Sequence, residues 1–166
     1  NDSVLCQSCE TTLSRMSKAY NNHRCKSLSG QLGYGYGYDA TKEDNWLTGE
    51  LTDFSASVIV NQKLPLRIRP CNKLTPLPEV VGAPCKQISE TDIIFDLGRE
   101  QVGFLGFELV SPCEQNITIS YGEHLADGQV RRIIGDRDFS IDYRCKVGNN
   151  TFFNPFRRFG CRYLEV

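Results

Sequence analysis

The stretch that decides the fold is residues 116–122, which read NITISYG. One of its two faces is apolar and the other is small or polar: Ile117, Ile119 and Tyr121 against Thr118, Ser120 and Gly122. A period of two with one apolar side is typical of a β-strand that has one buried and one wet face. Residues 102–110 and 139–147 repeat the pattern. We expect one apolar layer made by Leu105, Phe107, Leu109, Ile117, Ile119, Tyr121, Ile141 and Tyr143, with Cys145 among them.

From residue 92 onward the chain predicts a series of short strands. The expected strands are residues 92–97, 102–110, 116–122, 139–147, 151–153 and 158–166. Gly, Pro or Asn punctuates the gaps between them, at Gly98, Ser111-Pro112, Asp127-Gly128 and Gly148-Asn149-Asn150. Several short strands with turn signals between them favour a mostly β protein, an antiparallel β-sandwich of jelly-roll type.

The N-terminal part of the chain differs in kind. Leu13, Met16 and Tyr20 follow one another at helical spacing, so residues 10–20 predict a short amphipathic helix. A Gly/Tyr segment follows at residues 30–37. We therefore divide the chain into residues 1–50, the helix and the segment leading into the sandwich, and residues 51–166, the sandwich itself.

Composition excludes several classes of protein. The chain has 166 residues, a length that suits one domain, and a net charge of -1 with both signs interspersed. Nucleic acid and anionic membranes are therefore not expected as partners, because they require a basic surface. The longest apolar runs fall far short of the ~18 residues needed to span a bilayer. The chain begins at Asn1 and ends at Val166 inside a strand-like run, so we expect a piece of a longer polypeptide.

The order of short motifs after residue 93 carries a family resemblance. These motifs are Phe95-Asp96-Leu97-Gly98, Val102-Gly103-Phe104-Leu105, Ile119-Ser120-Tyr121-Gly122-Glu123-His124-Leu125, Asp127-Gly128, Asp142-Tyr143, Asn154-Pro155-Phe156 and Phe159-Gly160-Cys161-Arg162-Tyr163. Together they resemble the β-sandwich module that precedes the catalytic helical barrel in bacterial α-L-rhamnosidases. The resemblance is strongest over residues 93–166.

The resemblance implies a non-catalytic accessory domain of a bacterial glycoside hydrolase, exported to the periplasm or beyond, whose partner is the catalytic barrel of the same chain. The paired carboxylates of such enzymes lie on the barrel. Two alternatives stay open: a carbohydrate-binding module that recognises rhamnose-containing glycans, and a domain of another hydrolase that shares the sandwich.

No residue of the chain is predicted to be catalytic. Inverting glycosidases need two carboxyl groups about 6.5–9.5 Å apart. Glu123 and His124 are adjacent, and neighbours on a strand point to opposite faces. We expect Glu123 to tether a backbone amide or an arginine, or to contact a sugar hydroxyl or the barrel. Arg162 is a candidate contact with a carboxylate of the next domain.

Aromatic residues near the N-terminus are the candidates for sugar binding. Tyr34, Tyr36 and Tyr38 alternate with glycines, and Trp46 follows. In an extended chain the three tyrosine rings share one face, which suits stacking on a pyranose. The alternative is a strand whose tyrosines pack over the sandwich.

No metal site or cofactor is predicted. Asp136, Asp138 and Asp142 lie close in sequence, with calcium held through carbonyls as an alternative, but the run lacks the features of an EF-hand. The zinc candidates Cys6, Cys9, His23 and Cys25 include only one pair at knuckle spacing. Of the eight cysteines, we expect Cys145 and Cys161 to pack inward as free thiols.

Overall fold

The computed structural model describes residues 9–21, 27–44, 48–49, 53–60, 70 and 84–166. The chain divides into two compact units, Asn1–Ser17 with Asp44–Pro78 and Lys18–Glu43 with Glu79–Val166. In the first unit, β1 (Leu13–Ser14) pairs antiparallel with β6 (Ser55–Ala56). The second unit holds the main sheet. The boundary expected at residue 51 stays a prediction.

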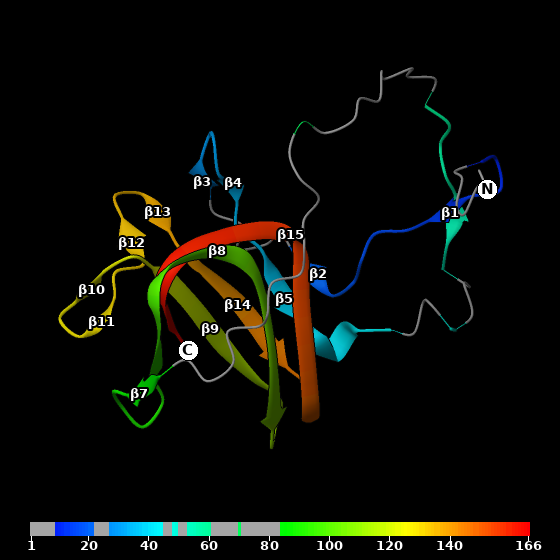
Figure 1. The fold of residues 1–166 in the computed structure, drawn as a ribbon. Helices are drawn as coiled ribbons and strands as arrows, with labels where there is room; N and C mark the ends of the chain where they lie inside the picture. Colours follow the sequence, from blue (N-terminus) through cyan, green and yellow to red (C-terminus); the bar gives the residue numbers. More distant parts are fainter. Residues whose placement is uncertain (1–8, 22–26, 45–47, 50–52, 61–69, 71–83) are drawn as a thin grey trace. The chain divides into compact units, whose positions relative to one another are not determined.

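The main sheet has seven strands in the order β2-β5-β14-β9-β15-β8-β7 (Figure 1). Their bounds are β2 (Tyr20–Asn21), β5 (Gly37–Asp39), β7 (Cys85–Gln87), β8 (Ile93–Ser111), β9 (Gln115–Gly122), β14 (Ser140–Cys145) and β15 (Gly148–Glu165). All neighbours are antiparallel except β5 and β14, which run parallel. The predicted strands 116–122 and 139–147 correspond to β9 and β14.

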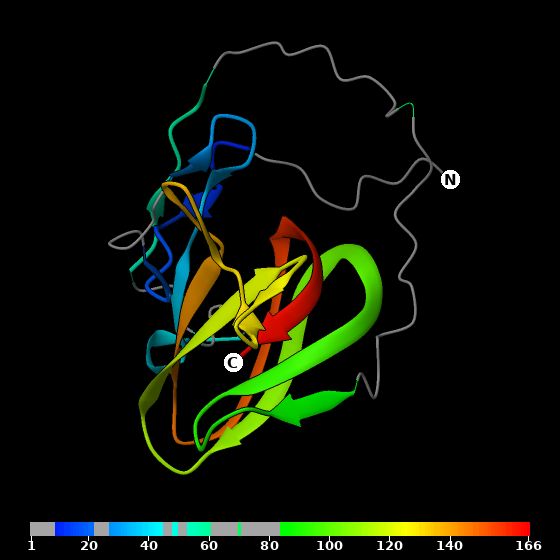
Figure 2. The same cartoon turned by 90° about the vertical axis from the view of Figure 1, so that its left-hand side faces the viewer.

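Two long strands convert this sheet into a sandwich. β8 and β15 have 19 and 18 residues and pair with each other along most of their length. We call residues 101–111 of β8 and 148–161 of β15 the ribbon. Figures 1 and 2 show the ribbon arching across β9 and β14. Beyond it, Tyr163–Glu165 pairs with β9 as well as with β8, so the second layer is continuous with the first.

The core lies between the ribbon and the strands β9 and β14. Ile119, Tyr121 and Ile141 pack there against Phe159 and Cys161. A second cluster joins Ala40, Tyr143 and Cys145 to Phe152. The remaining predicted core residues, Leu105, Phe107, Leu109 and Ile117, are half-buried against these clusters. The predicted sandwich and its apolar layer are therefore confirmed.

Val147 is the exception to the alternation of residues 139–147. A period of two over these residues predicts that Val147 points inward with Ile141 and Tyr143, but Val147 is 64% exposed. β14 ends at Cys145, and the chain turns into β15 from Gly148, whose φ of 85° suits a glycine.

The predicted helix over residues 10–20 is wrong. Leu13 belongs to β1 and Tyr20 to β2, and Met16 is exposed. A helix of this length is marginal in isolation, and the segment's serines, threonines and tyrosine have modest helix propensity, so strand pairing prevails. Within the part of the chain that the structure describes, the only helix is the 3-10 turn η1 (Ala40–Lys42).

Gly98 does not separate two strands as predicted. It has a φ of 76° and lies within β8, where four residues, 97–100, stand opposite Arg162 alone. Such a bulge bends a strand without ending it. Residues 151–153 and 158–166 likewise join into β15, because the irregularity around Asn154-Pro155 interrupts the register but not the pairing with β8.

Three short hairpins complete the described structure. β3 (Ser27–Ser29) pairs with β4 (Gly33–Tyr34), β10 (Leu125–Ala126) with β11 (Gln129–Val130), and β12 (Ile133–Ile134) with β13 (Arg137–Asp138). The Asp127-Gly128 turn signal is confirmed, because both residues have positive φ, as a two-residue type I′ hairpin requires.

Among the described residues, no helix has the length and apolarity needed to cross a membrane.

Candidate functional site

The structure places the three candidate tyrosines in different surroundings. Tyr34 ends β4 and is 67% exposed. Tyr36 is half-buried and packs against both core clusters. The ring of Tyr38 stacks on Tyr143 at 5.7 Å between centroids and lies 4.7 Å from Phe152. Burial raises the pKa of Tyr36 and of Tyr38. Trp46 lies outside the described residues, and sugar stacking on this segment stays a prediction.

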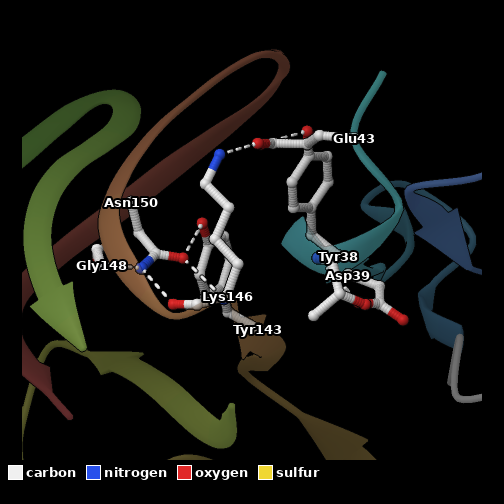
Figure 3. A network of polar contacts seen from close by, with 8 residues as sticks. Tyr38, Asp39, Glu43, Tyr143, Lys146, Gly148 and Asn150 are labelled. Carbon is white, nitrogen blue, oxygen red and sulfur yellow. Dashed lines mark hydrogen bonds and ion pairs between the residues drawn. The ribbon is translucent and has the colours of Figure 1, made fainter. Parts of the chain in front are cut away.

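A polar network next to these rings joins η1 to the turn between β14 and β15 (Figure 3). Glu43 follows η1 directly, and its Oε1 accepts a hydrogen bond from the Tyr38 hydroxyl at 3.0 Å. The Oε2 of the same carboxylate forms an ion pair with Lys146 Nζ at 2.5 Å. Asp39 caps η1 by accepting from the Thr41 amide at 3.1 Å. The network therefore links Tyr38 and η1 to the turn between β14 and β15.

Asn150 is the buried centre of this turn, with 1% exposure. Its Oδ1 accepts from the Lys146 amide at 3.0 Å and from the Tyr143 hydroxyl at 3.3 Å. Its Nδ2 donates to the carbonyls of Lys146 and Gly148, both at 2.9 Å. The side chain is fully engaged, so its role is structural. Burial raises the pKa of Tyr143 to about 12.

Arg162 contacts a carboxylate within its own domain. Its Nε and Nη2 donate to the two oxygens of Asp96 at 3.0 and 3.1 Å, and its guanidinium lies 4.9 Å from the Tyr163 ring centre. The pair holds the pKa of the Asp96 carboxyl below its usual value, with help from the Gly98 amide. Glu123 is exposed directly after β9. A contact of either residue with another domain stays a prediction.

Sequence reasoning missed Asn154 and Arg157, which shape the bend of β15. Asn154 is buried, and its Oδ1 accepts from the amides of Phe156 at 2.8 Å and of Arg157 at 3.0 Å. Arg157 Nη1 donates to the carbonyls of Leu32 (3.3 Å) and Tyr34, which ties the β3–β4 hairpin to β15. The Asn154-Pro155 dipeptide was the available signal, since this pair favours turns.

Two of the three aspartates of the calcium alternative accept hydrogen bonds from separate partners. Asp138 accepts from Ser140 Oγ at 2.7 Å, Asp142 accepts from Thr118 Oγ1 at 3.1 Å, and Asp136 is exposed. No group of three or more His, Cys, Asp or Glu side chains that could hold a metal is found among the residues described. The absence of a cofactor and the calcium alternative both stay predictions.

Two cysteine predictions are confirmed. Cys145 and Cys161 are buried free thiols, and burial raises the pKa of Cys161 to about 11. Of the zinc candidates, Cys9 is exposed, while Cys6, His23 and Cys25 lie outside the described residues.

A shallow cleft of about 480 Å³ lies on the wet side of β9. It is lined by Asp92, Thr118, Ser120, Ala126, Gln129, Val130, Arg131, Arg132, Ile133, Glu165 and Val166. Glu165 Oε2 accepts from the Val130 amide at 2.6 Å and anchors one wall. Val130 Cγ1 would lie 3.1 Å from a Cβ at Gly122, so the glycine lets the wall approach β9 closely. Hydroxyls and charges of both signs make the cleft suitable for a small polar ligand.

One segment of the chain is similar to a known protein family. Residues 86–166 match the family model of the bacterial alpha-L-rhamnosidase concanavalin-like domain. This segment is therefore similar to the concanavalin-like domain of bacterial α-L-rhamnosidases. The match spans β8, β9, β14 and β15, and therefore most of the core of the sandwich. No curated protein sequence matches the chain.

Two solved rhamnosidases share this fold. The Streptomyces avermitilis α-L-rhamnosidase complexed with L-rhamnose matches 85% of this chain at 19% identity with a TM-score of 0.58. The α-L-rhamnosidase of Dictyoglumus thermophilum matches 80% at 14% identity with a TM-score of 0.55. The GH78 family rhamnosidase of Bacillus sp. GL1 matches 55% at 30% identity with a TM-score of 0.40. The chain spans 14%, 16% and 9% of their respective lengths.

Proposed function

We propose that the chain is a non-catalytic accessory domain of a bacterial α-L-rhamnosidase-like glycoside hydrolase and supports the catalytic barrel of the same parent chain. The observation that carries the proposal is the match of residues 86–166 to the rhamnosidase concanavalin-like domain. The matched residues supply both layers of the sandwich. The parent acts in the periplasm or outside the cell.

Three carboxylates of the chain are held in hydrogen bonds and ion pairs within the fold, and this supports a non-catalytic role. Glycoside hydrolysis needs an acid and a base that face the same bond. Asp96 is held by Arg162, Glu43 by Tyr38 and Lys146, and Glu165 by a backbone amide. Each of these carboxylates serves the fold, and none is paired across an open site with a second one.

Assay of two proteins tests the proposal. The purified chain should not hydrolyse an aryl α-L-rhamnoside, whereas the polypeptide encoded by the complete open reading frame should. Turnover by the chain alone that exceeds the blank and survives repurification contradicts the non-catalytic role. A complete polypeptide that cleaves other aryl glycosides but no rhamnoside contradicts the assignment to a rhamnosidase-like parent.

A second candidate function, binding of rhamnose-containing glycans, is favoured by the polar cleft and by the exposed ring of Tyr34. A monosaccharide at such a shallow site should bind at millimolar concentration, roughly -4 kcal/mol. NMR titration with L-rhamnose should shift either the cleft residues or Tyr34. Arg131→Ala and Tyr34→Ala should each abolish the shifts at its own site only. Unchanged spectra at tens of millimolar sugar would refute this function.

A further inference from the structure

The outer face of the ribbon carries apolar side chains where a solvated strand face would be polar. Phe153, Val102 and Phe104 are 60%, 59% and 39% exposed. Register puts them on one side, because Phe153 pairs with Gly106, Phe104 with Arg158 and Val102 with Gly160. The opposite side holds Phe107 and Phe152, which face the core. The rings of Phe104 and Phe153 meet edge to face, 6.2 Å apart.

Glycines stand opposite two of the three apolar residues, Val102 and Phe153. A Cβ at Gly106 would lie 3.2 Å from Phe153 Cδ2, so the phenyl ring rests directly on the strand. The pairing of Gly160 with Val102 also leaves that side chain without a bulky neighbour. The Phe153 ring is therefore supported by the backbone, and the Phe104 ring contacts the Phe153 ring; such pre-ordering lowers the cost of binding.

Charged residues flank the apolar centre. Arg158 pairs with Phe104, and Glu108 stands opposite Thr151 on the same side of the ribbon. An apolar centre with a charged rim is the usual anatomy of an interface between proteins, and aromatic and arginine side chains supply most of its hot spots.

We propose that this face, made by Val102, Phe104, Glu108, Phe153 and Arg158, docks against another domain of the parent polypeptide. The inference rests on the proposed function and adds the surface through which the domain supports its partner. The solved rhamnosidases with this fold devote only 14% and 16% of their length to the matched part, so most of such a chain lies in other domains. The partner surface is apolar, with a carboxylate facing Arg158 and a cation facing Glu108.

The test compares the chain alone with the complete parent polypeptide. The double variant Phe104→Thr, Phe153→Thr removes the rings and puts β-branched residues, which suit a strand, in their place. Ile134→Thr is the matched control, since Ile134 is 45% exposed on a separate hairpin. In the chain alone, Ile134→Thr should change the melting temperature little, because exposed side chains contribute little to folding stability. The double variant removes a ring contact as well, so it should lower the melting temperature of the chain alone slightly and that of the sandwich in the parent by more.

In the wild-type parent, the sandwich should melt above the temperature of the chain alone. The double variant should remove this difference and speed proteolysis between the domains by about tenfold, the factor given by 1.4 kcal/mol of lost coupling. The Ile134→Thr parent should behave as the wild type.

Three results would overturn the docking face. The first is that the wild-type sandwich has the same melting temperature alone and in the parent, and the second is that the double variant is destabilised as much in the chain alone as in the parent. The third is that light scattering finds dimers of the wild-type chain and monomers of the double variant. Hydrolysis of α-L-rhamnosides by the wild-type parent is scored separately. If the wild-type parent does not hydrolyse them, the proposed function is refuted. The docking face is still decided by the difference in melting temperature between the chain alone and the parent.

Discussion

Replacing Asn150 by alanine should destabilise the domain strongly, although the residue touches no candidate ligand site. The buried amide makes four hydrogen bonds, to the Lys146 amide, the Tyr143 hydroxyl and the carbonyls of Lys146 and Gly148. A hydrogen bond contributes about 0.5–1.5 kcal/mol net. The bond to Tyr143 is long at 3.3 Å, so we expect a total loss of about 3 kcal/mol. At about 2–4 °C per kcal/mol, the melting temperature should fall by about 6–12 °C.

Asn149→Ala is the matched control for this variant. Asn149 is the neighbouring residue of the same type and is exposed, so its truncation should change stability by less than about 0.5 kcal/mol. Urea unfolding followed by far-UV circular dichroism measures both variants. If Asn150→Ala costs less than about 1 kcal/mol, or no more than Asn149→Ala, the turn is not held by the amide and the reasoning is wrong.

Three further predictions concern the core and its titrating groups. Ile119→Ala should cost about 2–5 kcal/mol and Ile119→Val about 0.5–1.5 kcal/mol in the same urea assay, and equal small losses would contradict the core position. Burial raises the pKa of Cys161 to about 11 and of Tyr143 to about 12, so the unfolded chain releases these protons first and stability should fall as the pH rises above about 9. Each group contributes up to about 1.4 kcal/mol per pH unit to the slope of the unfolding free energy against pH. Tyr143→Phe should make this decline shallower, and an unchanged slope would show that the pKa of Tyr143 is not raised by folding. The Asp96 carboxyl, whose pKa Arg162 lowers, should titrate below the usual range in carbon-detected NMR, with stability lost as the pH falls through that pKa. Arg162→Gln should return the pKa of the Asp96 carboxyl to its usual range. If the Asp96 midpoint does not move in this variant, the ion pair with Arg162 does not form in solution.

Alternation made the centre of the sandwich predictable. Ile119, Tyr121 and Ile141 are buried as their period of two requires, because a shift by one residue would turn all of them toward solvent. The Asp127-Gly128 turn was predictable for a comparable reason, since its positive φ angles restrict the residues that fit. These features depend on local geometry, which a short window of sequence specifies.

Features that depend on distant parts of the chain were not predictable in the same way. Tyr20 fits a helical pattern as well as a strand, and only pairing of β2 with β5 decides between them. Gly98 serves as a turn signal in one context and as a bulge in another, and the long partner strand β15 makes it a bulge. The candidate tyrosines show the same limit, because alternation does not tell which of Tyr34 and Tyr38 has Tyr143 as a neighbour.

The parallel pairing of β5 with β14 has a consequence for synthesis of the chain. Gly37 finds its partner at Asp142, so 105 residues separate the two ends of this contact (142 minus 37). At about 5–20 residues per second, a ribosome needs roughly 5–20 seconds to make the intervening segment. During that time the rings of Tyr36 and Tyr38 have no β14 or ribbon to cover them. The nascent domain therefore exposes an aromatic segment until nearly all of it has emerged, which is the kind of surface that chaperones bind.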